Sequence, residues 1–592
     1  MPESKLDQQY VEQVIADIKD KQRRAAIYAK EHQAFIKKFP AELQAHIPYL
    51  ALAQEEMQRA MQDTAHHVDH TKEQHPTDAV SGTSAPAGNC INALGEKGRA
   101  MGNTLVQRSF GSKIGHVDKE NNRVVLNYDA AFFFELAKAK GVKTTIHMRT
   151  TDFLTEVLFY SYKHGAKGYE AIIKANAKTP EEAEKLLKFL HNPAVQNYIE
   201  EGALTYQKVV DNGLKHYEDM LVFPDDAADE DRKLLADSVE LCAKEGRTIG
   251  NDERMMRALG MQQNLLNHEL LVRSGHHPNN LITIYQGRIT DHQYVWNHEA
   301  RCFVVIPHLE PSYPDYENQK ARFSRRLPEA FRSSIDKLMD GARYYRQMRA
   351  LEKELERQGI KVPDYVIHCC SDSRSLTKFI VAAGAEQLHK AYRNPGARVS
   401  LDGELVGGAE RSLAYCELTG AIPILAPHTN CGAQEAIDEI FNGKGKDLPP
   451  AFVHSAHAHG TITKTIWNLG ETPDENQPVT DYVNCRPAKD VAAHFSRKTG
   501  IPLETVADSA AAWGLMLDYQ IVKQEFIGLP LIAVCQNVRE RTNHLFNKNT
   551  GKFEAIEPSA IIEFDPEPAH PACNCGGHGH GGHAIKAAPG TH

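Results

Sequence analysis

The sequence lacks the marks of several large protein classes. No uncharged apolar run approaches the ~18 residues that span a bilayer. The first residues, MPESKLDQQYVEQV, are not a charged start followed by an apolar run. There is no basic arm, and 68 Lys and Arg against 77 Asp and Glu leave a net charge of -9. We therefore expect a cytoplasmic protein with no membrane span and no affinity for nucleic acid.

Cysteine is scarce and irregularly placed. The 592 residues contain 11 cysteines, an odd number scattered over a long chain. This usage fits the reduced thiols of a cytosol better than the disulfide framework of a secreted protein. Two of the cysteines, Cys369 and Cys370, are adjacent. Such a pair favours metal chemistry over a bridge.

The chain is predicted to form several units, because 592 residues exceed what one core accommodates. Apolar residues at helical spacing come first, and a polar stretch rich in Pro, Gly and Ser follows. The predicted segments are a helical segment (1–65), a linker (66–89), an α+β domain of unknown function (90–330), an α/β domain (331–565) and a tail rich in Gly, Cys and His (566–592).

The α/β fold class rests on the second half of the chain. The runs DYVIHCC, AIPILAPH and GLPLIAVCQNV have the composition of strands and alternate with helical patterns. This alternation is typical of βαβ units, so we expect a mainly parallel central sheet flanked by helices. A long amphipathic helix is expected ahead of it, over 334–358.

Chemistry-bearing residues follow two of the predicted strands. Cys370-x-Asp372-x-Arg374 closes the strand at 365–369, and His428-x-x-Cys431 closes the strand at 421–427. The ends of parallel strands meet at one edge of a sheet, where open α/β folds place their sites. Two thiolates and one imidazole suit Zn2+. Three ligands leave a coordination position open, which is typical of catalytic zinc, whose bound water has a pKa near ~7.

The neighbours of Cys370 favour the same interpretation. Cys370 keeps the C-x-D-x-R spacing, and strand alternation points Cys369 to the opposite face, where it would fill the core. Asp372 is close enough to accept a hydrogen bond from a zinc-bound hydroxide, and the forked donors of Arg374 could hold that carboxylate. Left unpaired, Asp372 could itself bind zinc. The alternative is a closed structural zinc site or a chance match.

These motifs resemble those of the β-class carbonic anhydrases, CSDSR followed by HTxCGA. Here they read CSDSR (370–374) and HTNCGA (428–433). The segments AYRNPGARVS, ERSLAYCELTGAIPILAPHTNCGA and NHLFNKNTGKFEAI are similar to further parts of that family, so the resemblance spans roughly 334–562. Two positions depart from the family: Pro427 replaces the usual Gly, and RNPGA replaces RNAGN.

The resemblance implies a β-carbonic-anhydrase-like fold and activity. The activity would be reversible hydration of CO2 to bicarbonate and a proton by zinc-bound hydroxide. Cys370, His428 and Cys431 would be the zinc ligands, with Asp372 and Arg374 as the orienting dyad; in some members the Asp moves onto the metal. A homodimer or higher homo-oligomer is also implied, because family sites are lined by both subunits.

Two other functions stay open. The same zinc site could hydrolyse carbonyl sulfide or carbon disulfide, as relatives with narrowed access do. The chain could instead be a zinc-stabilised binding protein without catalysis, although a purely structural site would not need Asp372 and Arg374.

For most of the other Cys and His residues we expect structural roles or exposed positions. Cys416 lies in a helical pattern and is expected in the core. Six histidines between 268 and 308 match no ligand template, so we expect hydrogen-bonded or exposed side chains: His268, His276, His277, His292, His298 and His308. A duplicated unit in the first half would be metal-free, because Cys90, Cys242 and Cys302 carry neither motif. The tail could bind metal through its Cys and His residues.

Overall fold

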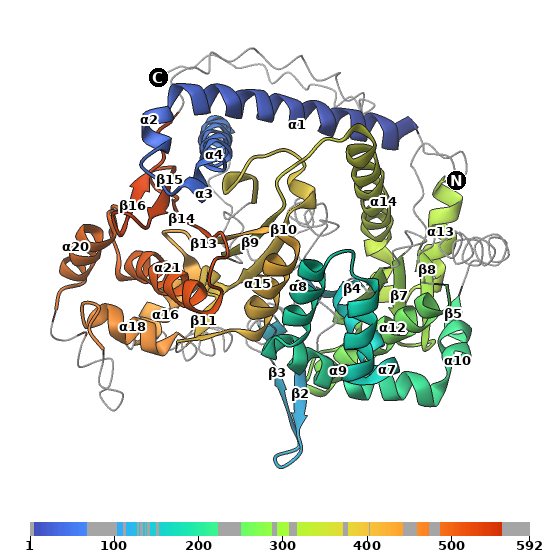
Figure 1. Cartoon of the computed structure of the whole chain (residues 1–592). Coiled ribbons are helices and arrows are strands. Elements are labelled where there is room, and N and C mark those ends of the chain that lie inside the picture. Colours follow the sequence, from blue (N-terminus) through green and yellow to red (C-terminus); the bar gives the residue numbers. More distant parts are fainter. Residues whose placement is uncertain are drawn as a thin grey trace, which may run out of the picture. The chain divides into compact units, whose positions relative to one another are not determined.

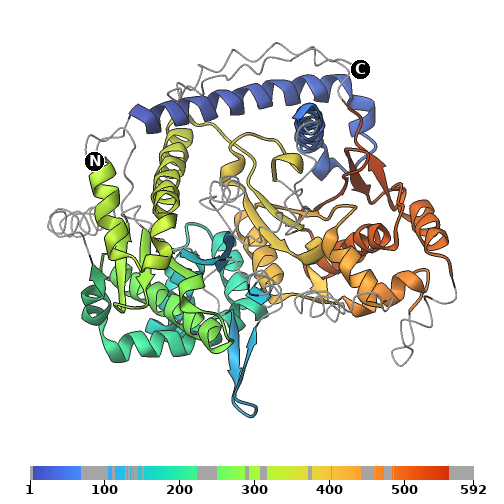
Figure 2. The ribbon, with the colours of Figure 1, turned by 180° about the vertical axis from the view of Figure 1, so that it is seen from behind.

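The computed structural model contains two six-stranded sheets with helices around them, seen from opposite sides in Figures 1 and 2. The described residues are 5–67, 104–109, 114–126, 130, 134–135, 138, 143–149, 153–222, 250–286, 293–306, 316–370, 377–401, 403–441, 459–472, 483 and 486–558. Most of the predicted linker, the tail, Asp372 and Arg374 lie outside the described residues.

The second half of the chain forms a mostly parallel sheet. Its strands lie in the order β10-β9-β13-β14-β15-β16, with three parallel pairs followed by two antiparallel pairs. A mixed helix and strand architecture with a mostly parallel sheet is therefore confirmed for this half. The strands are β9 (Tyr365–Cys370), β10 (Lys390–Asn394), β13 (Ile422–Ala426), β14 (Ile532–Asn537), β15 (Thr542–Asn547) and β16 (Lys552–Ala555), beside a small hairpin of β11 (Ser400–Leu401) and β12 (Glu404–Leu405).

Helices alternate with these strands, as the sequence predicted. They are α15 (Gly407–Thr419), α16 (Gly432–Phe441), α18 (Gly460–Trp467), α20 (Ala488–Thr499) and α21 (Val506–Glu525), with short 3-10 turns η5 (Thr377–Phe379), η6 (Glu386–Leu388) and η7 (Pro395–Ala397).

The first half forms a second sheet, in the order β1-β4-β6-β7-β8-β5. Its strands are β1 (Thr104–Ser109), β4 (Lys143–Arg149), β5 (Leu221–Val222), β6 (Leu281–Gln286), β7 (Gln293–Asn297) and β8 (Cys302–Ile306), beside a hairpin of β2 (Gly115–Asp118) and β3 (Arg123–Leu126). The helices are α7 (Phe153–Asn176), α8 (Pro180–Leu190), α9 (Pro193–Asn212), α10 (Leu214–Asp219), α12 (Gly250–Arg273) and η3 (Pro278–Asn280). Helix α8 begins with a capped first turn, in which the Thr179 hydroxyl accepts from the Glu182 N–H and Pro180 takes the first helical position.

Two helical segments complete the fold, and each covers one sheet. The first lead comprises α1 (Lys5–Glu31), α2 (Gln33–Ile36), α3 (Ala41–Gln44) and α4 (Ile47–His67); the second lead comprises α13 (Tyr316–Arg326), η4 (Glu329–Ser334) and α14 (Ile335–Gln358). The first lead packs on the second-half sheet and the second lead packs on the first-half sheet. In Figure 1 the blue helices of the first lead accordingly lie beside the red strands β15 and β16. The domain boundaries predicted from composition remain predictions.

None of the helices in the described ranges combines the length and apolar character needed to cross a membrane. This agrees with the absence of long apolar runs in the sequence.

A buried ion pair ties the segment after β10 to helix α21. Arg398 donates from Nε and Nη2 to the two carboxylate oxygens of Asp518, at 2.8 and 2.9 Å. The Val399 N–H and the Ser400 hydroxyl also donate to Asp518. Both charged side chains are almost fully buried, at 6% and 2% exposure. This pair therefore holds the 394–400 segment against the helix that also supports the candidate site.

Removing one member of this pair should be costly. In Asp518→Ala the Arg398 guanidinium stays buried without its partner, so we expect the free energy of unfolding to fall by about 3–5 kcal/mol. Chemical denaturation measures this. The control is Glu417→Ala, which breaks the solvent-exposed Lys188–Glu417 pair and should cost no more than ~1 kcal/mol. Equal effects of the two changes would contradict the expectation.

Candidate metal centre

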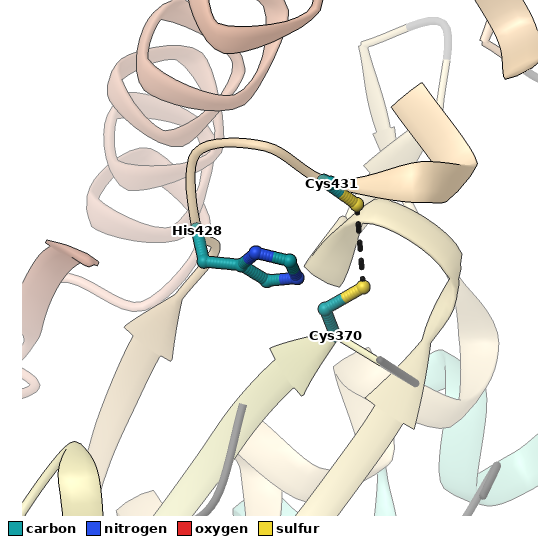
Figure 3. Close-up of side chains that lie close together, drawn as sticks. All are labelled: Cys370, His428 and Cys431. Carbon is teal, nitrogen blue, oxygen red and sulfur yellow. Dashed lines mark hydrogen bonds between the residues drawn. The ribbon is translucent and has the colours of Figure 1, made fainter. Parts of the chain in front are cut away.

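Three side chains from the two predicted motifs lie together at the edge of the second-half sheet. The potential ligand atoms of Cys370, His428 and Cys431 are all within 4.8 Å of one another, and all three residues are buried. The two sulfurs are 3.5 Å apart, and the imidazole faces them (Figure 3). The structure therefore brings together the three residues that the sequence predicted as zinc ligands; their role as ligands remains a prediction.

Strand register explains why these residues meet. Strands β9 and β13 are parallel neighbours, with Cys369 opposite Ala426. Cys370 ends β9 and therefore lies beside the loop that follows β13. His428 extends that strand by a bridge to Gln536 of β14, and Cys431 directly precedes α16. A parallel sheet places these chain ends at one edge.

The two adjacent cysteines have different surroundings. Cys369 packs in the hydrophobic cluster that the first lead shares with the sheet, whereas Cys370 packs with Cys431 and Ala397. Alternation along β9 separates them, as expected. Cys416 is fully buried in the core that includes α15, also as expected.

The imidazole of His428 is held in a defined orientation. Its Nδ1 lies 2.8 Å from the carbonyl oxygen of Thr429. Because a carbonyl only accepts, Nδ1 carries the proton and donates it, and Nε2 keeps its lone pair. A hydrogen bond that fixes the distal nitrogen is the usual support of a metal-ligating histidine.

The two thiols fit a soft divalent cation. The neighbouring Cys431 and burial raise the pKa of the Cys370 thiol well above its ordinary value. Two sulfur anions 3.5 Å apart in a buried place would repel each other strongly unless a cation lies beside both. Two sulfurs and one imidazole nitrogen form a donor set that zinc prefers. The residues therefore fit the metal that the motifs imply.

The loop between His428 and Cys431 is fastened by helix α21. Asn430 has a left-handed backbone, with φ of 54°, and its N–H donates to Asp508 Oδ1 at 2.7 Å. Thr429 donates to the side chain of Asn537 and accepts from the Val538 N–H. The loop that carries two of the three ligand candidates is therefore held from both sides.

Asp508 is fully buried, and its carboxylate accepts hydrogen bonds from several donors. It forms a capping box with Thr505 at the start of α21 and accepts from Arg539. Burial alone would raise the pKa of the Asp508 carboxyl, but the Asn430 N–H and the Arg539 guanidinium hold it below its ordinary value. The sequence reasoning missed this residue; the pattern Thr505-x-x-Asp508 ahead of an apolar helix was the available signal.

A buried amide lies one helical turn beyond Cys431. Gln434 is 1% exposed, and within the described part of the chain neither its Oε1 nor its Nε2 has a hydrogen-bond partner. It lies against Gly396, where an added Cβ would come 2.3 Å from Nε2. The next residue, Ala397, packs with Cys370 and Cys431. A buried amide without partners is costly in a folded protein, which makes Gln434 a candidate for contact with a ligand. No sequence signal marked it.

His459, a buried histidine close to Gln434 and Gly396, is uncharged near neutral pH. His459 also borders Gly396, and burial together with Arg398 lowers the pKa of His459 to about 3. The neutral His459 imidazole can therefore donate or accept a hydrogen bond, but it places no positive charge near the site.

The histidines of the first half form no metal site among the residues that the structure describes. His268 Nδ1 lies 2.9 Å from the Thr283 hydroxyl, and His276 Nε2 lies 2.9 Å from the Phe134 carbonyl. The cluster of Cys370, His428 and Cys431 is the one group of three or more potential ligands in the described ranges. His292, His308 and the tail lie outside them.

The support from Asp508 can be tested by substitution. In Asp508→Asn the charge that faces Arg539 is lost and one acceptor oxygen becomes a donor, so we expect a loss of about 1–3 kcal/mol in the free energy of unfolding and faster release of bound zinc. Denaturation and competition with a chelator measure these. The control Asp490→Asn, at an exposed position in the first turn of α20, should change stability by no more than ~0.5 kcal/mol. Unchanged zinc release in Asp508→Asn would contradict the role.

Comparisons with known proteins add little evidence about the family, fold or activity of the chain. No protein family model matches the chain. No curated protein matches it either. A solved structure entitled "The structure of the beta-carbonic anhydrase CcaA" aligns with 39% of this chain and 94% of that chain, at 17% identity and a TM-score of 0.27. A likeness this weak carries no argument about fold or activity, so the site's geometry and the two motifs remain the basis for interpretation.

Proposed function

We propose that the chain binds zinc through Cys370, His428 and Cys431 and catalyses the reversible hydration of CO2 to bicarbonate and a proton. The observation that carries this proposal is the buried cluster of two thiols and one imidazole at the ends of parallel strands. The two sequence motifs have the order and spacing of the β-class carbonic anhydrases, which supports the same activity.

Zinc held by three protein ligands supplies an open coordination position and a Lewis acid that lowers the pKa of water toward about 7. The chain contributes the orientation of its donors. The carbonyl of Thr429 fixes the His428 ring, and Asp508 fixes the loop that carries His428 and Cys431. Pre-oriented ligands keep the geometry constant through the reaction.

Asp372 and Arg374 are proposed as the orienting dyad. In this proposal Asp372 accepts a hydrogen bond from the reacting water. That hydrogen bond orients the water so that a lone pair on its oxygen points at the carbon of CO2. Arg374 would hold the carboxylate in place by paired N–H donors. Both roles rest on the motif.

Gln434 is proposed to contact the substrate. Its amide lies beside the segment that packs on Cys370 and Cys431, and it has no other hydrogen-bond partner in the described part of the chain. Nε2 would donate to an oxygen of CO2 or bicarbonate, a bond that strengthens as negative charge develops on that oxygen.

The compartment is proposed to be reducing, as in the cytoplasm. All six cysteines in the described ranges are free thiols. Oxidation of Cys370 and Cys431 would remove both proposed sulfur ligands, so the site requires surroundings that keep thiols reduced.

The central test combines metal content with turnover. We expect Cys370→Ser to lose zinc and CO2 hydration together, and Asp372→Asn to keep zinc but lose rate by roughly 10²-fold or more. Metal analysis and stopped-flow hydration measure the two properties. The control is Asp364→Asn, an exposed aspartate just ahead of β9, which should leave both unchanged.

Substrate choice is decided in the same assay. CO2, carbonyl sulfide and carbon disulfide would be offered in turn at mildly alkaline pH. Turnover of a sulfur substrate without CO2 hydration would replace the proposed reaction. Full zinc occupancy with no turnover of any substrate would leave a zinc-stabilised binding protein.

Replacing Gln434 with an apolar residue should raise the stability of the protein and lower its activity. In Gln434→Leu a buried amide without partners becomes apolar, so we expect the free energy of unfolding to rise by about 1 kcal/mol or more while CO2 hydration falls roughly tenfold and zinc content stays unchanged. The matched control is Gln536→Leu, a buried glutamine that donates to the Phe379 carbonyl; that change should reduce stability. Full activity of Gln434→Leu would show that the amide does not meet the substrate.

A further inference from the structure

The two sheets repeat one strand pattern. In the first half, β1-β4-β6-β7-β8 pair as parallel, parallel, antiparallel and antiparallel. In the second half, β9-β13-β14-β15-β16 pair in the same sequence of directions. The strands that differ, β5 and β10, lie at the sheet edges.

The register of the last three strands is also repeated, residue by residue. Gln286 is opposite Gln293, and Gln536 is opposite Asn543. Each member of the second pair lies 250 positions after its counterpart (536 minus 286, and 543 minus 293). The next hairpin keeps the same shift: Asn297 opposite Cys302 becomes Asn547 opposite Lys552. Identical loop lengths and registers in two unrelated hairpins would be an improbable coincidence.

Local hydrogen bonds are repeated at the same positions. Asn297 Oδ1 accepts from the N–H two residues later, and Asn547 Oδ1 does the same, both at 3.0 Å. Asn297 Nδ2 donates to the Arg326 carbonyl of the second lead, and Asn547 Nδ2 donates to the Lys38 carbonyl of the first lead. The two asparagines therefore bind the same place in two different leads.

The two leads also share a backbone turn at a proline and the same spacing of buried apolar residues. Pro40 precedes α3 with φ and ψ of -53° and 143°, and Pro328 precedes η4 with -48° and 143°. The difference of 288 positions (328 minus 40) relates the apolar residues that each lead buries. Those of the first lead are Phe35, Phe39, Leu43, Ile47, Leu50 and Ala51; those of the second are Phe323, Leu327, Phe331, Ile335, Leu338 and Met339.

Each lead precedes one sheet in the chain but packs on the other. Phe39 and Ile47 of the first lead share a core with Ile532 of β14. Leu327 and Ile335 of the second lead share a core with Ile282 of β6. An element exchanged between two copies of one unit is the arrangement of a swapped dimer, here within a single chain.

At the two described positions that correspond to Cys370 and His428, the first half has no soft metal donor. Arg149 is the partner of Gln286, as His428 is the partner of Gln536. Ser109, at the end of β1, occupies the position of Cys370, because Met148 opposite it directly precedes Arg149 as Pro427 precedes His428. Neither serine nor arginine is a soft metal donor.

We propose that the chain is a fused pair of one ancestral unit, in which the first copy has lost its metal site. The lead of the first copy covers the sheet of the second copy, as the lead of a partner subunit would in a dimer. The first lead covers the back of the sheet that carries Cys370 and His428, so the proposed zinc site depends on the first half without receiving a ligand from it. A single chain is then sufficient to hold one metal at this site. The metal count rests on the proposed function; the exchange of leads does not.

The exchange is tested by a crossed pair of mild substitutions read by hydrogen exchange of the full chain. Phe39→Leu should make the amides of β14–β16 exchange several-fold faster and leave β6–β8 unchanged. Leu327→Val, its counterpart in the second lead, should do the reverse. If each change loosened the sheet that follows its own lead in the sequence, the proposal would be overturned.

The metal count is tested by native mass spectrometry of the zinc-loaded chain. Wild type should retain in single chains one zinc that Cys370→Ser lacks, whereas Ser109→Ala, the matched change in the first copy, should lose none. Loss of zinc in Ser109→Ala, or zinc found only in paired chains, would contradict the proposal. Equal zinc content in all three proteins would remove the proposed metal site, while the crossed exchange pattern would still decide the fusion.

Discussion

The parallel register of β9, β13 and β14 is the constraint on which the rest depends. It places the end of β9, with Cys370, beside the loop that begins at His428, which is itself bridged to Gln536. Two sulfurs and an imidazole then share a buried space that disfavours two uncompensated thiolates. A shift of one residue would turn Cys370 into the core and Cys369 toward the site. The chemistry proposed for this edge follows from that register.

The site is supported from layers that are distant in sequence. Helix α21 holds the ligand loop through Asp508 and the segment after β10 through Asp518. The opposite face of the sheet is covered by the first lead, whose apolar residues pack against β9 and β14. Local opening of either layer would loosen the donors, because their positions are set by packing rather than by the loop itself. Precise donor placement is what a metal site and its reaction require.

The repeated architecture explains why the chain contains a first-half sheet that has no soft metal donor at the two described positions equivalent to Cys370 and His428. Two copies of one unit exchange their leads, and each sheet then depends on the other copy for part of its core. Once the copies are joined in one chain, only one of them has to keep the donors, since the other is retained by its packing role. Cysteine motifs do not mark this copy, because Arg149 and Ser109 occupy the equivalent positions and the two halves are alike in strand register and apolar spacing.

Local patterns in the sequence were sufficient for the strands around the motifs and for the grouping of Cys370, His428 and Cys431, because residue periodicity and motif spacing act over short stretches. Which sheet each lead covers was decided by tertiary structure alone, since apolar residues such as Phe39 and Leu327 specify burial but no particular partner. The same holds for Asp508 and Gln434. Their significance comes from groups brought near by folding, Asn430 for the first and Gly396 for the second, and not from the residues beside them in the chain.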